Sequence, residues 1–249
     1  MNPLKQLETC GQSLWLDYLK RSLIENGELR TLIERDGLKG ETSNPSIFEK
    51  AIGESDEYKG ALEKFQAEAD HSISEIYEHL AVADIRAAAD VLHPVYDQTQ
   101  GRDGYISLEC SPYLANDTDA TIGEARRLWQ MVDRPNLMVK VPATPAGIPA
   151  IRELIGRGLN VNITLLFSVS VYEQVVEAYI AGLETLKKAG GDVSKVASVA
   201  SFFVSRIDTA VDKRLDKLQD HAAADRLRGK VAIANAKMAY QHYRKAFAD

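Results

Sequence analysis

The amino-acid sequence predicts an α/β protein of the (β/α) barrel class. Short apolar runs of strand length alternate with longer segments of helical apolar spacing, and this alternation is typical of parallel strands joined by helices. Six runs are expected to be strands, and they end near Asp17, Ser43, Cys110, Pro142, Phe167 and Val204. Barrels of this class commonly reach about 250 residues as one domain. The 249 residues therefore predict a single domain over residues 1–249.

The composition excludes two classes of partner. The net charge is −6 and the charged residues are interspersed, so the chain lacks the basic patch of a nucleic-acid-binding protein. No apolar run is long enough to span a bilayer and no signal-type segment opens the chain, which indicates a cytoplasmic protein without a membrane partner. Cys10 and Cys110 stand far apart without metal-type spacing, and we expect both to be small buried thiols.

The first half of the chain is expected to contain three strands. The expected segments are strands at 13–17, 38–42 and 105–110, one helix at 22–35 and two helices between 49 and 92. Asp36-Gly37 should end the first of these helices. The second strand runs into the polar turn Ser43-Asn44-Pro45-Ser46, where the proline should start a helix.

The second half is expected to contain three more strands. The expected segments are strands at 137–142, 160–167 and 195–204 and helices at 121–133, 170–189 and 208–248. Thr121 with Glu124, and Ser170 with Glu173, have capping-box spacing and should begin two of these helices. Gly190-Gly191 should end the second.

Lys140 is an anomaly in the fourth strand because its neighbours are apolar. Such a lysine must reach solvent, pair with a carboxylate or lose its proton, since burying an unpaired ammonium costs more than a shifted pKa. Only the third outcome makes it a nucleophile. The alternative is an ordinary strand-end lysine paired with a neighbouring acid.

Polar side chains stand near the carboxyl ends of all six expected strands, where a (β/α) barrel assembles its active site. They are Asp17, Asn44, Glu109, Lys140, Asn162, Thr164, Ser201 and Arg206. In the fifth strand Asn162 and Thr164 share one face while Ile163 and Leu165 take the other. Taken alone, Glu109 could be a salt-bridged residue and Arg206 could cap a loop or pair with Asp208. Together they fit imine chemistry, in which an amine condenses with a ketone and a carboxylate removes a hydroxyl proton.

The chain resembles the transaldolase family along essentially its whole length. The shared motifs are Trp15-Leu16-Asp17, Thr42-Ser43-Asn44-Pro45-Ser46, Ser107-Leu108-Glu109, Val139-Lys140-Val141-Pro142-Ala143-Thr144, Asn162-Ile163-Thr164-Leu165-Leu166-Phe167-Ser168 and Ser201-Phe202-Phe203-Val204-Ser205-Arg206-Ile207-Asp208. The resemblance implies transfer of a dihydroxyacetone unit between sugar phosphates of the pentose phosphate pathway. It implies no metal and no organic cofactor.

The resemblance also implies roles for the catalytic groups. Lys140 would form the Schiff base with a ketose phosphate such as fructose 6-phosphate or sedoheptulose 7-phosphate. Asp17 would take the proton of the C4 hydroxyl, so that the C3–C4 bond breaks. Glu109 and Thr164 would hold the water of imine formation and hydrolysis.

The binding groups follow in the same way. Asn44 and Asn162 would hold the dihydroxyacetone unit, and Ser201 and Arg206 would bind the substrate phosphate. The family barrel has eight strands, whereas six are expected here, so two strand edges would stay unpaired and invite association between copies. Two alternatives to the transferase are a lysine-dependent aldolase that releases free dihydroxyacetone and an inactive barrel fragment that needs a completing partner.

Overall fold

The core of the structure is one sheet of six parallel strands in sequential order. The computed structural model describes residues 2–44, 48, 56–66 and 71–248. The strands are β1 (Leu14–Asp17), β2 (Leu38–Thr42), β3 (Tyr105–Glu109), β4 (Leu137–Pro142), β5 (Val161–Leu166) and β6 (Ser198–Phe202). The predicted fold class, a (β/α) barrel architecture with six strands, is confirmed.

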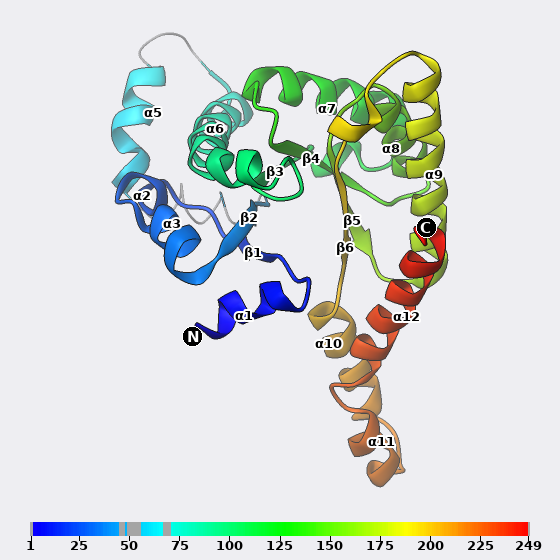
Figure 1. Cartoon of the computed structure of the whole chain (residues 1–249). Coiled ribbons are helices and arrows are strands. Elements are labelled where there is room, and N and C mark those ends of the chain that lie inside the picture. The colour runs from blue at the N-terminus through cyan, green and yellow to red at the C-terminus, as the bar shows by residue number, and fades with distance from the viewer. Residues whose placement is uncertain (1, 45–47, 49–55, 67–70, 249) are drawn as a thin grey trace.

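Helices surround the outer face of this sheet. The α-helices are α1 (Pro3–Thr9), α2 (Arg21–Glu25), α3 (Glu28–Thr31), α5 (Lys59–Gln66), α6 (Ile73–Gln98), α7 (Thr118–Val132), α8 (Gly147–Gly156), α9 (Val169–Lys188), α10 (Ser205–Leu215), α11 (His221–Leu227) and α12 (Val231–Ala246). The short turns are the π-helix η1 (Leu32–Asp36) and the 3-10 helices η2 (Asp56–Tyr58), η3 (Pro112–Leu114) and η4 (Val193–Lys195). Figure 1 shows the strands curving around a common interior, with α6 to α9 along the outside and α11 projecting away from the sheet.

The two faces of the sheet differ in polarity because side chains alternate along each strand. Ile106, Val139 and Val161 face the helices and are fully buried. Burial of each such side chain stabilises the fold by roughly 1.5–3 kcal/mol. One apolar cluster extends from Leu19 to Ala239 and joins the helices to this outer face. Ser107, Lys140 and Asn162 each follow one of these apolar residues in the chain and therefore take the opposite, inner face.

The predicted starts of two helices were wrong. Asp117, rather than Thr121, caps α7, and its carboxylate accepts a hydrogen bond from the Ala120 N–H at 3.0 Å. Ser168 caps α9 in the same way and accepts from the Val171 N–H at 3.3 Å. In each helix a capping residue in an extended conformation precedes the predicted one in the chain. Its side chain already accepts a hydrogen bond from an N–H group of the first turn, so the helix begins there.

Other boundaries also differ from the prediction. The helix expected at 22–35 is broken because Gly27 adopts a left-handed φ of 78°, after which α3 and η1 follow. The sixth strand is shorter than expected because residues 193–195 form a 3-10 turn, anchored by the Asp192 carboxylate. Cys10 is exposed at the end of α1, whereas Cys110 is buried as expected.

Two helices expected between residues 49 and 92 are present as α5 and α6. A complete capping box at Ser72 and Glu75 starts α6. The predicted turn residues Pro45 and Ser46, and the predicted helix start at Glu49, lie outside the described residues.

Both edge strands pair on one side only. β1 pairs with β2 and β6 pairs with β5, and within the described residues no strand joins β1 to β6. The sheet is therefore open between its first and last strands. None of the helices in the described part of the chain has both the length and the apolar character needed to cross a membrane.

Glu41 is a buried carboxyl on the outer face of β2. It is 0% exposed and lies in register with Leu16 and Ile106, so it points toward the helix layer. Neither carboxyl oxygen has a hydrogen-bond partner among the described residues. Burial raises the pKa of Glu41 from 4.5 to about 8. At neutral pH this carboxyl therefore keeps its proton.

Replacing Glu41 by leucine should stabilise the chain, and increasingly so as the pH rises. Because the folded-state pKa of about 8 lies above the unfolded value of 4.5, the folded state holds the extra proton between these pH values. The free energy of unfolding of the unchanged chain should fall through this window by a few kcal/mol in order of magnitude. Urea unfolding at pH 5, 7 and 9 measures the slope, which Glu41→Leu should reduce and the exposed control Glu177→Leu should not. Equal slopes for Glu41→Leu and the unchanged chain would contradict this account.

Candidate active site

Lys140 lies at the centre of the polar inner face. It is only 8% exposed, and its Nζ donates a hydrogen bond to the Ser43 carbonyl at 2.8 Å. The Glu109 carboxylate lies 3.3 Å from the same Nζ. Of the three outcomes open to a lysine in an apolar strand, the structure shows pairing with a carboxylate. Lys140 is thus the ion-paired lysine that the alternative interpretation expects. Its partner, Glu109, is itself a predicted site residue.

Strand register brings three predicted residues into one row. Glu109 on β3 pairs with Lys140 on β4, and Lys140 pairs with Asn162 on β5. Residues paired across parallel strands point to the same face of a sheet. The three side chains therefore share the inner face, and the Lys140 amine contacts the Ser43 carbonyl and the Glu109 carboxylate there.

A hydrogen-bonded set of side chains, which we call the polar floor, supports this row. The Ser201 hydroxyl donates to Asn162 Oδ1 at 2.7 Å, and Asn162 Nδ2 donates to the Ser107 hydroxyl at 2.9 Å. The Ser43 hydroxyl donates to the Ser107 carbonyl at 2.8 Å. Of these four residues, sequence reasoning had not identified Ser43 and Ser107 as site residues. Ser107 could have been found, because it stands two positions before Glu109 and so shares its face.

Thr164 lies on the same face as Asn162, but the strand is irregular just beyond it. Thr164 is 4% exposed and pairs in register with Pro142. Leu165, expected on the opposite face, instead has a left-handed φ of 60° and a side chain that is 39% exposed. The pairing of β5 with β6 shifts between Ile163 and Leu166, so the alternation predicted for the whole strand ends at Thr164.

Three other predicted residues lie at the same edge of the sheet. Asp17 ends β1 and is exposed, and its side chain forms no hydrogen bond or ion pair with residues that the structure describes. Asn44 follows β2, and its carbonyl accepts from the Phe48 N–H at 3.3 Å. Arg206 is exposed in the first turn of α10, with its guanidinium carbon 4.4 Å from the centre of the Phe203 ring.

The alternative pairing of Arg206 with Asp208 is not formed. The Asp208 carboxylate instead accepts from the Ala232 N–H at 3.2 Å and so ties α10 to α12. Arg206 therefore stays available at the carboxyl end of β6. Asp17 ends the edge strand β1 and Arg206 lies in the helix that follows the edge strand β6, whereas Lys140 is on a central strand.

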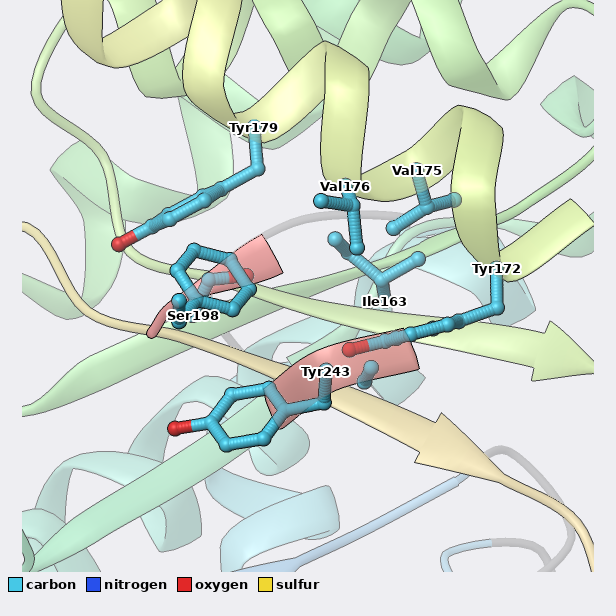
Figure 2. A pocket seen from close by; sticks show the side chains of 9 residues that line it. Ile163, Tyr172, Val175, Val176, Tyr179, Ser198 and Tyr243 are labelled. Carbon is cyan, nitrogen blue, oxygen red and sulfur yellow. The ribbon is translucent and has the colours of Figure 1, made fainter. Parts of the chain in front are cut away.

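A cavity of about 230 Å³ lies on the other side of β5 and is not part of this site. Figure 2 shows Ile163 of β5, Ser198 of β6 and the tyrosines of α9 and α12 around it. Ile163 faces away from Asn162 and Thr164 because neighbouring side chains alternate. The cavity is thus separated from Lys140 by the sheet itself.

The inner-face groups can exchange protons with an amine. Lys140 must lose a proton before it can attack a carbonyl, and the Glu109 carboxylate at 3.3 Å can take that proton directly or through one water. Asn162 is in register with Lys140, so its side chain lies on the same face of the sheet. In the described part of the chain, no group of three or more His, Cys, Asp or Glu residues could hold a metal ion.

Known proteins resemble this chain over nearly its whole length. The family described as Transaldolase/Fructose-6-phosphate aldolase matches residues 14–248. Proteins named Transaldolase from Trichodesmium erythraeum and Thermobifida fusca are each 49% identical to it, over 98% and 100% of this chain and 66% and 67% of their own. Transaldolase 1 of Streptomyces avermitilis is 50% identical over 98% of this chain and 64% of its own. The chain thus spans about two thirds of the length of the curated relatives it matches.

Replacing Asn162 by leucine should destabilise the chain by about 2–4 kcal/mol, because the hydroxyls of Ser107 and Ser201 would both lose their partner. Urea unfolding measures this loss. A matched control is Asn235→Leu, since the Asn235 side chain makes one solvent-exposed bond to the Phe167 carbonyl. That variant should lose less than about 1 kcal/mol. Equal losses in the two variants would show that the polar floor contributes nothing particular to stability.

Proposed function

Since this chain belongs to the transaldolase/fructose-6-phosphate aldolase family, we propose that it transfers a dihydroxyacetone unit through a Schiff base on Lys140. The donors would be fructose 6-phosphate or sedoheptulose 7-phosphate, and the acceptors erythrose 4-phosphate or glyceraldehyde 3-phosphate. The observation that carries the proposal is the burial of the Lys140 amine against the Glu109 carboxylate and the Ser43 carbonyl. An amine held in this way can react without competition from bulk water.

Imine formation is assigned to Lys140, Glu109 and Thr164. The Lys140 ammonium gives a proton to Glu109, and the free amine attacks the C2 carbonyl of the ketose. The carbonyl oxygen then leaves as water after taking up two protons, one from Glu109 and one from the attacking nitrogen, which keeps its last hydrogen in the protonated imine. Thr164 shares the inner face with Asn162 and would hold this water together with Glu109. Hydrolysis of the imine at the end of the cycle reverses these steps.

Cleavage of the carbon–carbon bond is assigned to Asp17. Its carboxylate takes the proton of the C4 hydroxyl, the C3–C4 bond breaks, and the electron pair moves into the protonated imine to give an enamine. The aldose phosphate leaves with its new aldehyde. In the second half of the cycle the enamine attacks the acceptor aldehyde, and Asp17 returns the proton to the new hydroxyl. The exposure of Asp17 at the end of β1 lets it reach a bound sugar.

Substrate binding is assigned to the remaining predicted residues. Asn44 and Asn162 would hold the hydroxyls of the dihydroxyacetone unit, and Arg206 would bind the phosphate with its guanidinium. Ser201 is proposed as a second phosphate ligand. Its hydroxyl now donates to Asn162 Oδ1, so it must rotate before it can donate to a phosphate.

Transfer is favoured over simple cleavage with release of dihydroxyacetone. The relatives at 48–50% identity are named Transaldolase, Transaldolase 1 or Transaldolase 2. The third alternative, an inert barrel fragment, is less favoured because this chain by itself forms the ion pair of Lys140 with Glu109 and the hydrogen bonds of Asn162 on the inner face. The two free cysteines support the proposed cytoplasmic location.

Association of copies is a further part of the proposal. The unpaired edges of β1 and β6 present backbone N–H and C=O groups that can pair with another chain. A homo-oligomer that covers these edges would keep water away from the site between them.

Borohydride should trap a covalent adduct on Lys140 when fructose 6-phosphate is present, because it reduces the imine to a stable secondary amine. Mass spectrometry of the intact chain and its peptides locates the adduct. In a coupled assay with fructose 6-phosphate and erythrose 4-phosphate, activity should vanish in Lys140→Ala. Asp17→Asn should still trap the adduct but lose turnover by about 10²- to 10⁴-fold, because only bond cleavage needs its carboxylate.

The acceptor separates the alternatives in the same assay. A transferase needs erythrose 4-phosphate for turnover, whereas an aldolase releases free dihydroxyacetone without it. If the unchanged chain forms no adduct and shows no turnover, the proposed function is wrong for this chain.

The chain should sediment as an oligomer in analytical ultracentrifugation at micromolar concentration, because the two open edges are otherwise unpaired. Ala200→Pro on β6 should lower the oligomer fraction, since proline removes an N–H from the edge. Ala246→Pro at the end of α12, away from the edge strands, is the control for proline itself. If the unchanged chain sediments as a monomer at micromolar concentration, self-association through these edges is ruled out.

A further inference from the structure

Ser107 joins two parts of the polar floor. It lies on β3 and is 0% exposed. Its hydroxyl accepts a hydrogen bond from Asn162 Nδ2 at 2.9 Å, and its carbonyl accepts one from the Ser43 hydroxyl at 2.8 Å. One residue therefore connects the amide on β5 with the end of β2.

The bond between Ser107 and Asn162 crosses the strand that carries the amine. β3 and β5 are separated by two strand spacings, about 9.6 Å in a flat sheet, and the inward curl brings their side chains within hydrogen-bond distance. Asn162 is in register with Lys140, whereas Ser107 is in register with Met138. The bond thus passes between Met138 and Lys140, on the amino-terminal side of the lysine.

The Asn162 amide is held from both sides. Ser107 receives one of its N–H groups, and Ser201 donates to its oxygen. An amide has two N–H donors and two acceptor lone pairs, so one of each stays free for a ligand. In the unliganded chain the two serines fix the plane in which this free pair lies, and the Ser107 bond is kept when Ser201 turns toward a phosphate.

The Lys140 amine is also connected to Ser107, through Ser43. Lys140 Nζ donates to the Ser43 carbonyl, and the Ser43 hydroxyl donates to the Ser107 carbonyl. Ser107 thus supports both the nucleophile and the amide beside it. Since Ser107 is fully buried in the unliganded chain, we assign its effect to these neighbours.

We propose that Ser107 is a positioning residue, whose hydroxyl orients the Asn162 amide toward the Lys140-bound dihydroxyacetone unit. The inference rests on the proposed function for its consequence in turnover. The hydrogen bond itself exists in the unliganded chain and can be tested there. Removing the hydroxyl leaves the Ser107 carbonyl in place, so the support of Lys140 through Ser43 is kept.

Ser107→Ala should disturb Asn162 without abolishing imine formation. In the unliganded chain the side-chain amide signal of Asn162 in a ¹⁵N NMR spectrum, assigned by its loss in Asn162→Ala, should shift and exchange faster with solvent. Turnover should fall by about 10- to 100-fold, the cost of misplacing a bound reactant. Borohydride trapping should stay close to that of the unchanged chain.

Three variants separate positioning from a structural role. Ser107→Thr restores a hydroxyl and should recover most of the turnover. Ser198→Ala removes a serine on β6 whose hydroxyl donates to the Val161 carbonyl on β5, and it should change neither the Asn162 signal nor turnover. Adding Ser107→Ala to Asn162→Ala should cost little further turnover, because the serine acts through the amide.

An unchanged Asn162 signal in Ser107→Ala, or an equal loss of trapping and turnover without rescue by threonine, would overturn the positioning role. A full additive loss in the double variant would overturn it as well. If the unchanged chain traps no sugar, the proposed function fails, and the NMR result then decides the role of Ser107 in orienting the amide by itself.

Discussion

In-register pairing of β3, β4 and β5 is the constraint on which the site depends. It sets Glu109, Lys140 and Asn162 in one row, so that an acid, an amine and an amide face the same interior. A slip of one residue in β4 would turn Lys140 into the helix layer and Val139 into the interior. The apolar outer face prevents such a slip, because each of its side chains would lose its packing against the helices. Packing against the helices thus determines which side chains of β4 face the interior.

The inner face tolerates its polar groups because they bond one another. Ser107, Asn162 and Ser201 form a continuous chain of hydrogen bonds, and a buried polar group costs little once it has a partner. Glu41 is the contrast on a neighbouring strand. It faces the apolar helix layer without a partner among the described residues, and burial holds it in the protonated form. Glu41 thus differs from the hydrogen-bonded polar floor on the inner face.

The proposed roles divide between the centre of the sheet and its edges. The amine and its supports lie on β3, β4 and β5, where every strand has two neighbours. The groups proposed for bond cleavage and phosphate binding, Asp17 and Arg206, lie at the ends of the edge strands. A chain that paired with β1 or β6 would therefore change the surroundings of these two groups and leave the polar floor intact. In the proposed mechanism, imine formation therefore depends on the central strands, whereas bond cleavage and phosphate binding depend on the edges.

The sequence alone predicted the α/β class, the approximate positions of the six strands and the common face of Asn162 and Thr164, because apolar periodicity and alternation are local properties of the chain. It also placed Glu109 and Lys140 near the carboxyl ends of their strands. It did not determine helix starts, since Asp117 and Ser168 compete with later capping residues for the same N–H groups. Nor did it determine the left-handed Leu165, which depends on a shift in pairing with β6. Only the tertiary structure decided that Lys140 pairs with Glu109 and that Ser107 reaches Asn162 across β4. These contacts depend on the curl of the sheet, which no local pattern specifies.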